Sequence, residues 1–205
     1  DPYHYRQSIR QAKLNFLGTN DPYWPLDALN LYWDDLVGPK YIVYVPNADH
    51  ALIDTQAPEG IARVLGGIVA LHEQTNGNLK LPNMKWQFTD HDQQLELLLR
   101  SDQAPQSASA WVATSTSHDF CDVRWHSFPM REVASALIGT DDRNGSSTSK
   151  AKRSRAFRYR LQMPGEGSAA LFGEAVYANN DLPYDLSTNV RIIGPENIRD
   201  TEMQR

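Results

Sequence analysis

The spacing of apolar residues changes near residue 80, and this change limits the folds that the chain can adopt. Before residue 80, short apolar runs alternate with stretches in which apolar residues recur every three or four positions. After residue 80, apolar residues recur every second position in several short runs. The first spacing is typical of amphipathic helices, and the second is typical of half-buried strands. The sequence therefore predicts an α/β domain over residues 1–80 and an all-β domain over residues 81–205.

Two apolar runs in the first domain predict strands of a parallel sheet. One covers residues 13–18 and closes at a glycine, and the other covers residues 41–45 and is followed by Pro46. Apolar spacing also predicts a helix over residues 25–37, with Pro25 in its first turn. A second helix is expected to bury Ile61, Val64, Leu65, Ile68 and Leu71. Alternation of strand and helix with short connections is typical of a parallel sheet covered by helices.

Several short runs in the second domain predict antiparallel strands. In the clearest run, residues 157–163, apolar side chains alternate with arginine and glutamine. Similar runs cover residues 84–89, 94–100, 108–115, 123–128, 169–177 and 189–193. Many short strands without good helices between them indicate an immunoglobulin-like β-sandwich. Residues 139–155 are polar and predict an exposed loop, whose basic residues are expected to be solvated rather than to bind phosphate.

Composition excludes several classes of partner. The formal net charge of −5 provides no electrostatic attraction for nucleic acid, and no apolar run approaches the ~20 residues that span a bilayer. Cys121 is the single cysteine, so an intrachain disulfide cannot form. His91 and His118 adjoin aspartates, but neighbouring residues on a strand point to opposite faces and chelate poorly. We therefore expect solvated turns at these histidines, no metal site and no cofactor.

Asp21 and His50 follow the two predicted parallel strands. Catalytic groups of open parallel sheets gather beyond the carboxyl ends of the strands, and neighbouring strands lie ~5 Å apart. Asp21 and His50 are therefore expected to meet, although 29 positions separate them. A carboxylate that accepts the Nδ1 proton of histidine orients the ring and stabilises the imidazolium during catalysis. Aspartate followed by histidine is also the order in which these residues occur in the α/β-hydrolase triad.

The nucleophile of such a triad is absent from these residues. The serine of α/β-hydrolases occupies a G-x-S-x-G turn that precedes both partners, and no such pentapeptide occurs here. The sequence is therefore interpreted as a C-terminal portion of a hydrolase. Its expected partner is the N-terminal half of the same protein, as a separate chain or a missing segment.

Each candidate site residue also has a structural interpretation. Asp21 could cap a helix that begins near Pro25, and His50 could be a loop histidine without a function. The chain order and the expected pairing favour the triad. Tyr23 and Trp24 could equally line a substrate pocket or fill the end of the strand. Trp111 and Trp125 are expected in the sandwich core, and Cys121 is expected to be structural.

Three stretches of the sequence resemble the PhoPQ-activated pathogenicity-related proteins, a family of α/β-hydrolase-like proteins. They are "LNFLGTNDPYWPLDALNLYWDDLVGPKYIVYVPNADH", "TSTSHDFCDVRWHSFPM" and "LFGEAVYANNDLPYDLSTNVRI". The resemblance implies a hydrolase-like domain followed by a β-sandwich, and secretion or a periplasmic location. It also implies that Asp21 in "GTND" is the acid of the family and that His50 in "VPNADH" is its histidine.

Two classes of function follow from the sequence. In the first, the complete protein is a serine hydrolase that cleaves a small ester, an amide or a peptide through an acyl-enzyme. In the second, the hydrolase fold is a non-catalytic scaffold, and the sandwich binds a surface, matrix or receptor partner.

Overall fold

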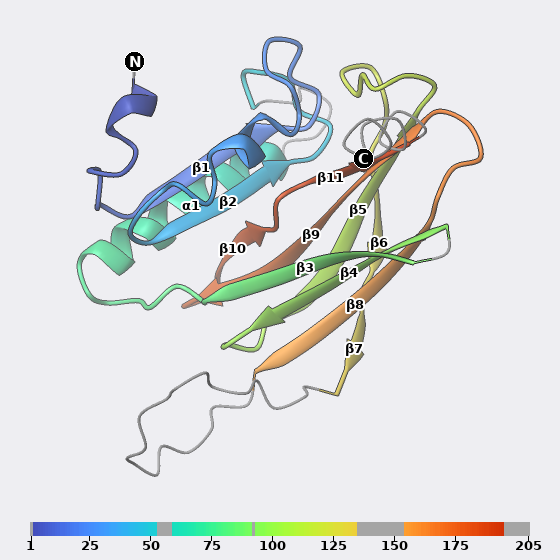
Figure 1. Ribbon diagram of the computed structural model, residues 1–205. Coiled ribbons are helices and arrows are strands. Elements are labelled where there is room, and N and C mark those ends of the chain that lie inside the picture. The colour runs from blue at the N-terminus through green and yellow to red at the C-terminus, as the bar shows by residue number, and fades with distance from the viewer. Residues whose placement is uncertain (1, 53–58, 92, 135–153, 195–205) are drawn as a thin grey trace, which may run out of the picture.

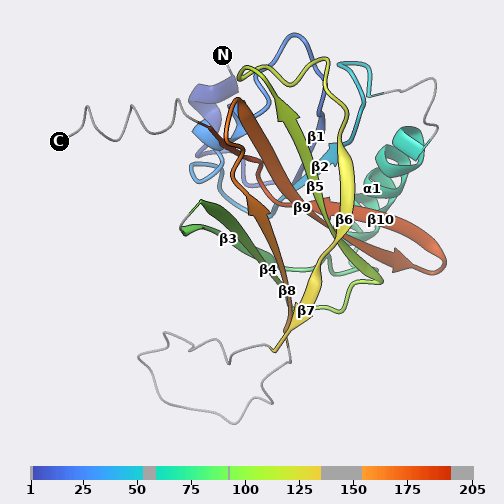
Figure 2. The same cartoon turned by 90° about the vertical axis from the view of Figure 1, so that its right-hand side faces the viewer.

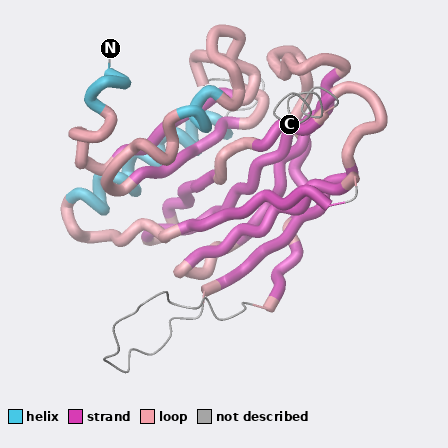
Figure 3. Tube along the Cα trace, viewed as in Figure 1, coloured by secondary structure: helices cyan, strands magenta, loops and turns pink. Residues whose placement is uncertain are grey.

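The computed structural model describes residues 2–52, 59–91, 93–134 and 154–194 (Figure 1). The helical elements are the 3-10 turns η1 (Pro2–Tyr5) and η2 (Ala28–Leu31) and the helix α1 (Glu59–Thr75). The strands are β1 (Lys13–Gly18), β2 (Lys40–Val45), β3 (Met84–His91), β4 (Gln94–Ser101), β5 (Ser107–Ser115), β6 (His126–Pro129), β7 (Arg131–Val133), β8 (Arg155–Gln162), β9 (Ser168–Asn179), β10 (Leu182–Ser187) and β11 (Arg191–Ile193). Strand dominates the chain after residue 80, as Figure 3 shows.

The strands β1 and β2 form a parallel pair, in which Lys13 lies opposite Lys40 and Gly18 lies opposite Val45. Both strands match the ranges predicted for them to within one residue. Their parallel direction brings both carboxyl ends to the same edge. A parallel sheet of two described strands is too small to define an α/β-hydrolase sheet, so that part of the predicted fold class stays a prediction.

The rest of the chain is mostly antiparallel sheet. One sheet has the strand order β10-β9-β5-β6, with β11 also paired to β9, and the other has the order β3-β4-β8-β7. Leu95, Leu97 and Leu99 of β4 pack against β5 and β9 in a shared core. The two sheets therefore face each other, as Figures 1 and 2 show. The predicted antiparallel character of the second segment is confirmed.

A second core joins the parallel pair to the sandwich. Tyr44 of β2 is fully buried against Phe172 of β9, with ring centroids 4.8 Å apart. Trp125 packs on the same Phe172 ring and is also fully buried. Trp111 is only partly buried and packs against the edge of this core.

An ion cluster lies where α1 approaches the β10-β9-β5-β6 sheet. Arg63 of α1 pairs with Glu174 of β9, and its Nη1 lies 3.2 Å from Oδ2 of Asp185 on β10. The guanidinium also lies near the ring of Trp111. Burial raises the pKa of Glu174 and that of Asp185, and the positive charge of Arg63 opposes both shifts.

The predicted helix over residues 25–37 is wrong. The segment forms the short turn η2 between other turns, and most of its backbone bonds join a residue to the third one before it, as in Ala28 to Pro25 and Tyr32 to Leu29. Aspartate, asparagine and aromatic residues fill the segment and have low helix propensity. The side chain of Asn30 instead donates to the carbonyl of Val190, which fixes the segment against the sandwich.

The helix α1 forms, and Val64 and Leu71 of its predicted buried face are partly buried against apolar clusters, but Ile61, Leu65 and Ile68 of that face are exposed. Its buried residues are Gly60, Gly66, Gly67 and Ala70. An added Cβ at Gly66 would lie 2.3 Å from the carbonyl oxygen of Pro183, so the small residues allow close approach to β10. The apolar residues Ile61, Leu65, Ile68 and Val69 are exposed instead, by 45%, 57%, 49% and 38%.

The basic residues Lys150, Lys152 and Arg153 of the predicted exposed loop lie outside the described residues. Arg155 begins β8, is exposed and bonds to Glu132. Within the residues that the structure describes, none of the helices has the length and apolarity that a bilayer crossing requires.

Candidate active site

The loops that follow β1 and β2 bring Asp21 and His50 into contact. Nδ1 of His50 lies 2.8 Å from Oδ2 of Asp21. The Asp21 side chain is 13% exposed, whereas the His50 side chain is 54% exposed. The carboxylate is thus held within the protein, and the imidazole faces solvent. This geometry allows the carboxylate to fix the ring while a second group approaches the other nitrogen.

Hydrogen bonds keep Asp21 ionised. Its Oδ1 accepts a bond of 2.8 Å from the amide of Tyr23. Burial by itself raises the pKa of Asp21, but the bonds from His50 and from the amides of Tyr23 and Trp24 outweigh burial and lower that pKa. Because a carboxylate accepts these bonds better than a carboxylic acid does, the arrangement favours the charged form.

The two loops approach each other closely because Gly18 ends β1. An added Cβ at Gly18 would lie 2.3 Å from the carbonyl oxygen of Asp49 and 2.6 Å from that of Ala48. The amide of Thr19 donates to Val45, and the amide of Asn20 donates to Ala48. These contacts set the spacing between Asp21 and His50.

Two asparagines that were not predicted as site residues connect the site to the sandwich. Nδ2 of Asn20 lies 2.8 Å from the carbonyl oxygen of Cys121 and 2.7 Å from that of Val123. Asn47 donates to the carbonyl of Trp125 and accepts from its amide at 2.7 Å. Asn47 has a φ of 60°, a conformation that asparagine tolerates better than most residues. The loop over residues 118–125 is therefore fixed beside the Asp21–His50 pair.

Cys121 is also part of this contact, but its thiol is a poor nucleophile. Its Sγ donates to the carbonyl oxygen of Asp21 at 3.3 Å. The hydrogen bond to Asp119, burial and the nearby negative charges raise the pKa of the thiol to about 11. Because the thiolate is the reactive form, Cys121 is protonated at neutral pH and acts as a structural donor here.

Tyr23 and Trp24 lie in different places around the pair. The ring of Tyr23 meets that of His50 edge-on, with centroids 5.1 Å apart. Trp24 lines a hollow of about 480 Å³ together with Asp21 and Phe120. Both aromatic side chains are mostly exposed, by 73% for Tyr23 and 63% for Trp24. Neither fills the end of a strand.

The described residues do not complete a triad. No hydrogen bond joins Nε2 of His50 to a serine within the part of the chain that the structure describes. The same residues contain no group of three or more metal-ligating side chains. His118 instead places its Nδ1 3.1 Å from the hydroxyl of Ser168.

Comparisons with known proteins identify a family. No curated protein matches the chain at a significant level. Among solved structures, a cycloalternan-degrading enzyme from Trueperella pyogenes, in complex with a covalent intermediate, is similar with a TM-score of 0.32 and 10% identity. That similarity covers 49% of this chain and 13% of the enzyme, so the chain spans a small part of that protein.

The family model of the PhoPQ-activated pathogenicity-related proteins matches residues 1–123. This range includes Asp21, His50 and most of the loop that Asn20 and Asn47 hold. Residues 171–192, which carried part of the predicted resemblance, lie outside it. Because the match covers more than half of the 205 residues, the chain belongs to the family of PhoPQ-activated pathogenicity-related proteins.

Proposed function

We propose that the complete protein is an α/β-hydrolase-type serine hydrolase, to which this chain contributes the acid and the histidine. The contact of 2.8 Å between Asp21 and His50 carries the proposal. The two residues follow neighbouring parallel strands in the order that the α/β-hydrolase triad requires. The low pKa of Asp21 also suits the acid of a triad, which stays ionised throughout the reaction.

Each residue has a distinct role in the proposed reaction. A serine upstream of this chain attacks the carbonyl carbon of an ester or an amide, and Nε2 of His50 accepts the serine proton. His50 then donates that proton to the leaving group, and water releases the acyl group in a second step. Asp21 positions His50 through Nδ1 and stabilises the imidazolium. Trp24 contacts the substrate in the hollow beside Asp21, and Tyr23 contacts it beside the His50 ring.

An upstream part of the protein is needed for this reaction, and the surface of α1 supports its existence. Leu65 and Ile68 are about half exposed and lie on the same helix as Ile61 and Val69, which are also exposed. Exposed apolar residues of this kind, on a helix beside the two described parallel strands, suit further hydrolase-type sheet and helix packed against it. We propose that this partner is the N-terminal half of the same protein.

We make two further proposals, the first from family membership and the second from the periodicity of the sequence. The protein is secreted or periplasmic, which cell fractionation with an antibody against the chain tests. Residues 1–80 belong to the hydrolase-like domain, and residues 81–205 form the sandwich domain. Limited proteolysis of the complete protein, with the boundaries of stable fragments read by mass spectrometry, tests this division.

A fluorophosphonate probe tests the hydrolase directly. The complete protein, including its upstream segment, is labelled, and mass spectrometry locates the adduct. We expect one modified serine upstream of this chain. The His50→Ala variant should lose labelling, and the Asp21→Asn variant should label far more slowly because the ring loses its orienting carboxylate. The His126→Ala variant, which removes an exposed histidine of β6, is the matched control and should label normally.

Failure to label the intact, folded protein would contradict the proposal, as would labelling that persists in the His50→Ala variant. Asp21 would then serve to hold the loop through the Tyr23 amide. The non-catalytic scaffold, with a sandwich that binds a surface, matrix or receptor partner, would become the better account of the protein.

A further inference from the structure

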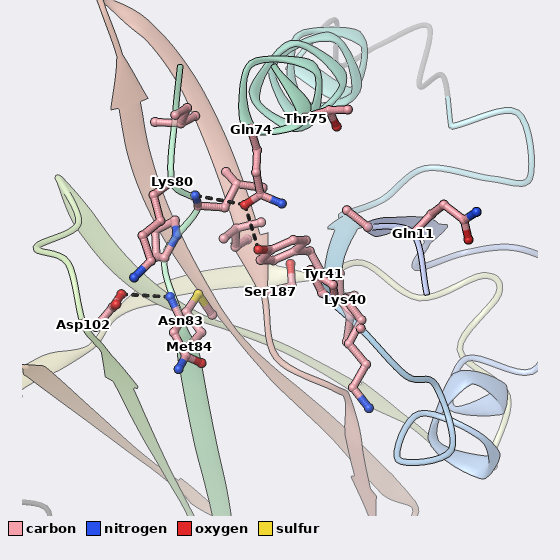
Figure 4. A pocket seen from close by; sticks show the side chains of 18 of the residues that line it. Gln11, Lys40, Tyr41, Gln74, Thr75, Lys80, Asn83, Met84, Asp102 and Ser187 are labelled. Carbon is pink, nitrogen blue, oxygen red and sulfur yellow. Dashed lines mark hydrogen bonds between the residues drawn. The ribbon is translucent and has the colours of Figure 1, made fainter. Parts of the chain in front are cut away.

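A hollow of the structure lies away from the Asp21–His50 pair. It has a volume of about 960 Å³ and is drawn in Figure 4. Its walls come from the starts of β1 and β2, the end of α1 and the segment that leads into β3. This volume is at the upper end of the ~300–1,000 Å³ that is typical of sites for small ligands.

Hydrogen bonds within the protein hold the wall of this hollow. Oε1 of Gln74 accepts bonds from the Tyr41 hydroxyl at 2.8 Å and from the Leu81 amide at 3.1 Å. Asp102 accepts from the Asn83 amide at 2.8 Å, as Figure 4 shows. These bonds leave the Gln74 Nε2 group, the Asn83 side-chain amide and the Lys80 amine without partners among the described residues. Donors and acceptors therefore remain available along a fixed wall.

A second hollow, of about 700 Å³, adjoins the first. Trp33, Met84 and Trp86 line both hollows and therefore form a ridge between them. The rings of Trp33 and Trp86 lie 5.9 Å apart at an angle of 37°, and both are partly buried against the second core. The Lys40 amine lies over the Trp33 ring, 4.8 Å from its centroid, and the exposed parts of the two rings line both hollows.

The charges around the second hollow are balanced. Lys85 and Arg191 are basic, Asp34 and Asp90 are acidic, and Arg191 lies 3.4 Å from Asp90. A site for an anion or a cation would carry charges mainly of the opposite sign. This mixture suits a neutral ligand that both donates and accepts hydrogen bonds.

We propose that the two hollows and the Trp33–Trp86 ridge bind a neutral oligosaccharide. A pyranose ring has an apolar face of C–H groups that packs on an aromatic ring, and its rim of hydroxyl groups both donates and accepts hydrogen bonds. The ridge supplies the aromatic surface, and Gln74, Asn83 and Asp34 supply polar partners on either side of it. Two hollows that flank one ridge accommodate at least two linked sugar units.

This site is separate from the proposed catalytic pair. Asp21 and His50 follow the carboxyl ends of β1 and β2, whereas Lys40 and Tyr41, which line the first hollow, begin β2. Six residues of strand separate the two ends by roughly 20 Å. Saccharide binding therefore does not depend on the hydrolase proposal, and His50→Ala should leave it unchanged.

Calorimetric titration of the protein with maltohexaose, cellohexaose, laminarihexaose and chitohexaose tests the inference, with tryptophan fluorescence recorded in parallel. We expect at least one of these sugars to bind with a Kd of about 1 mM or tighter and to change the fluorescence. Trp33→Ala should weaken that binding at least tenfold. Asp34→Ala removes an exposed polar group rather than part of the core and should weaken sugar binding severalfold. This variant decides the outcome if Trp33→Ala fails to fold.

Two variants control for general effects. Tyr5→Ala removes an exposed aromatic ring, and Glu166→Ala removes an exposed acid, both outside the two hollows. Both should bind the sugar as the unmodified protein does. Absence of heat and of a fluorescence change with all four sugars at about 10 mM would overturn the inference. Binding of undiminished affinity in a folded Trp33→Ala variant, or in Asp34→Ala where Trp33→Ala does not fold, would overturn it as well.

Discussion

At the scale of single residues, Gly18 should be indispensable to the geometry of the Asp21–His50 pair. We expect Gly18→Ala to lower the free energy of unfolding by about 1–3 kcal/mol, because the new methyl group overlaps backbone carbonyls that cannot rotate away. The same shift should lengthen the contact between Asp21 and His50. Urea denaturation measures the first effect, and NMR of the His50 ring protons measures the second.

Gly165→Ala is the matched control for this change, since an added Cβ there meets no atom within 4 Å. It should leave both measurements unchanged. A Gly18→Ala protein with the stability of the control and an intact His50 signal would show that the loops tolerate a wider spacing.

The residues of the candidate site differ in how far the sequence predicts their contacts. Asp21 and His50 could be paired from the sequence because each follows a recognisable strand, and parallel strands end at one edge. Asn20 and Asn47 could not, because their partners lie 101 and 78 positions away along the chain. Nothing near either asparagine in the sequence indicates which carbonyl it will meet. The catalytic assignment itself stays a prediction.

At the scale of elements, strands were easier to predict than helices. An alternation such as that of residues 157–163 requires one buried face and one exposed face. The strand β8, which pairs with β4, turns its apolar side chains to the sandwich core. The helix prediction for residues 25–37 failed because tertiary contacts, including that of Asn30 with Val190, outweighed apolar spacing. The buried face of α1 was assigned correctly only in part, because apolar spacing cannot reveal that glycines make the close contact.

Substitutions on the exposed face and on the buried face of α1 should differ in how far they lower the free energy of unfolding. Leu65→Gln should change the free energy of unfolding of this chain by less than about 0.5 kcal/mol, because the side chain is exposed. Gly66→Ala should lower it by about 1–3 kcal/mol, because the new methyl group meets the Pro183 carbonyl. The better helix propensity of alanine offsets part of that loss. Urea denaturation of both variants tests the assignment, and a larger loss for Leu65→Gln would contradict it.

At the scale of the whole molecule, contacts distant in sequence connect the two segments. Tyr44 packs on Phe172, and Arg63 reaches Glu174 and Asp185. The change from α/β to all-β elements could be predicted from periodicity, but these contacts could not, because periodicity reports which residues are buried and not what covers them. The short strand β10 was missed for a related reason: Pro183 and Asp185 interrupt its apolar pattern.

Removing the positive charge of Arg63 should make the free energy of unfolding depend on pH. Arg63→Met leaves Glu174 and Asp185 buried without a counter-ion, and we expect a loss of about 3–5 kcal/mol at neutral pH. Burial raises the pKa of both carboxyl groups in the folded state. The folded protein therefore binds more protons than the unfolded chain between the usual carboxyl pKa of ~4 and the raised values, and stability falls as pH rises through that range.

Urea denaturation at pH 5 and pH 8 measures this dependence. The Arg63→Met variant should be closer in stability to the unmodified protein at pH 5 than at pH 8. The double variant Arg63→Met/Glu174→Gln, which removes one of the two charges, should recover part of the loss at pH 8. If Arg63→Met lowers the free energy of unfolding equally at both pH values, the destabilisation comes from lost packing rather than from unpaired charge.

Asn20 and Asn47 contact the 118–125 loop through its main chain, and this has a consequence for how the family can diversify. A carbonyl or an amide is present whatever amino acid occupies the position, so substitutions in the loop leave these anchoring bonds in place. Phe120 is buried and Cys121 donates to Asp21, but the other loop side chains that face the hollow beside Asp21 can change while these main-chain bonds are retained. The lining of the hollow can in this way vary while the main-chain framework around Asp21 and His50 stays the same.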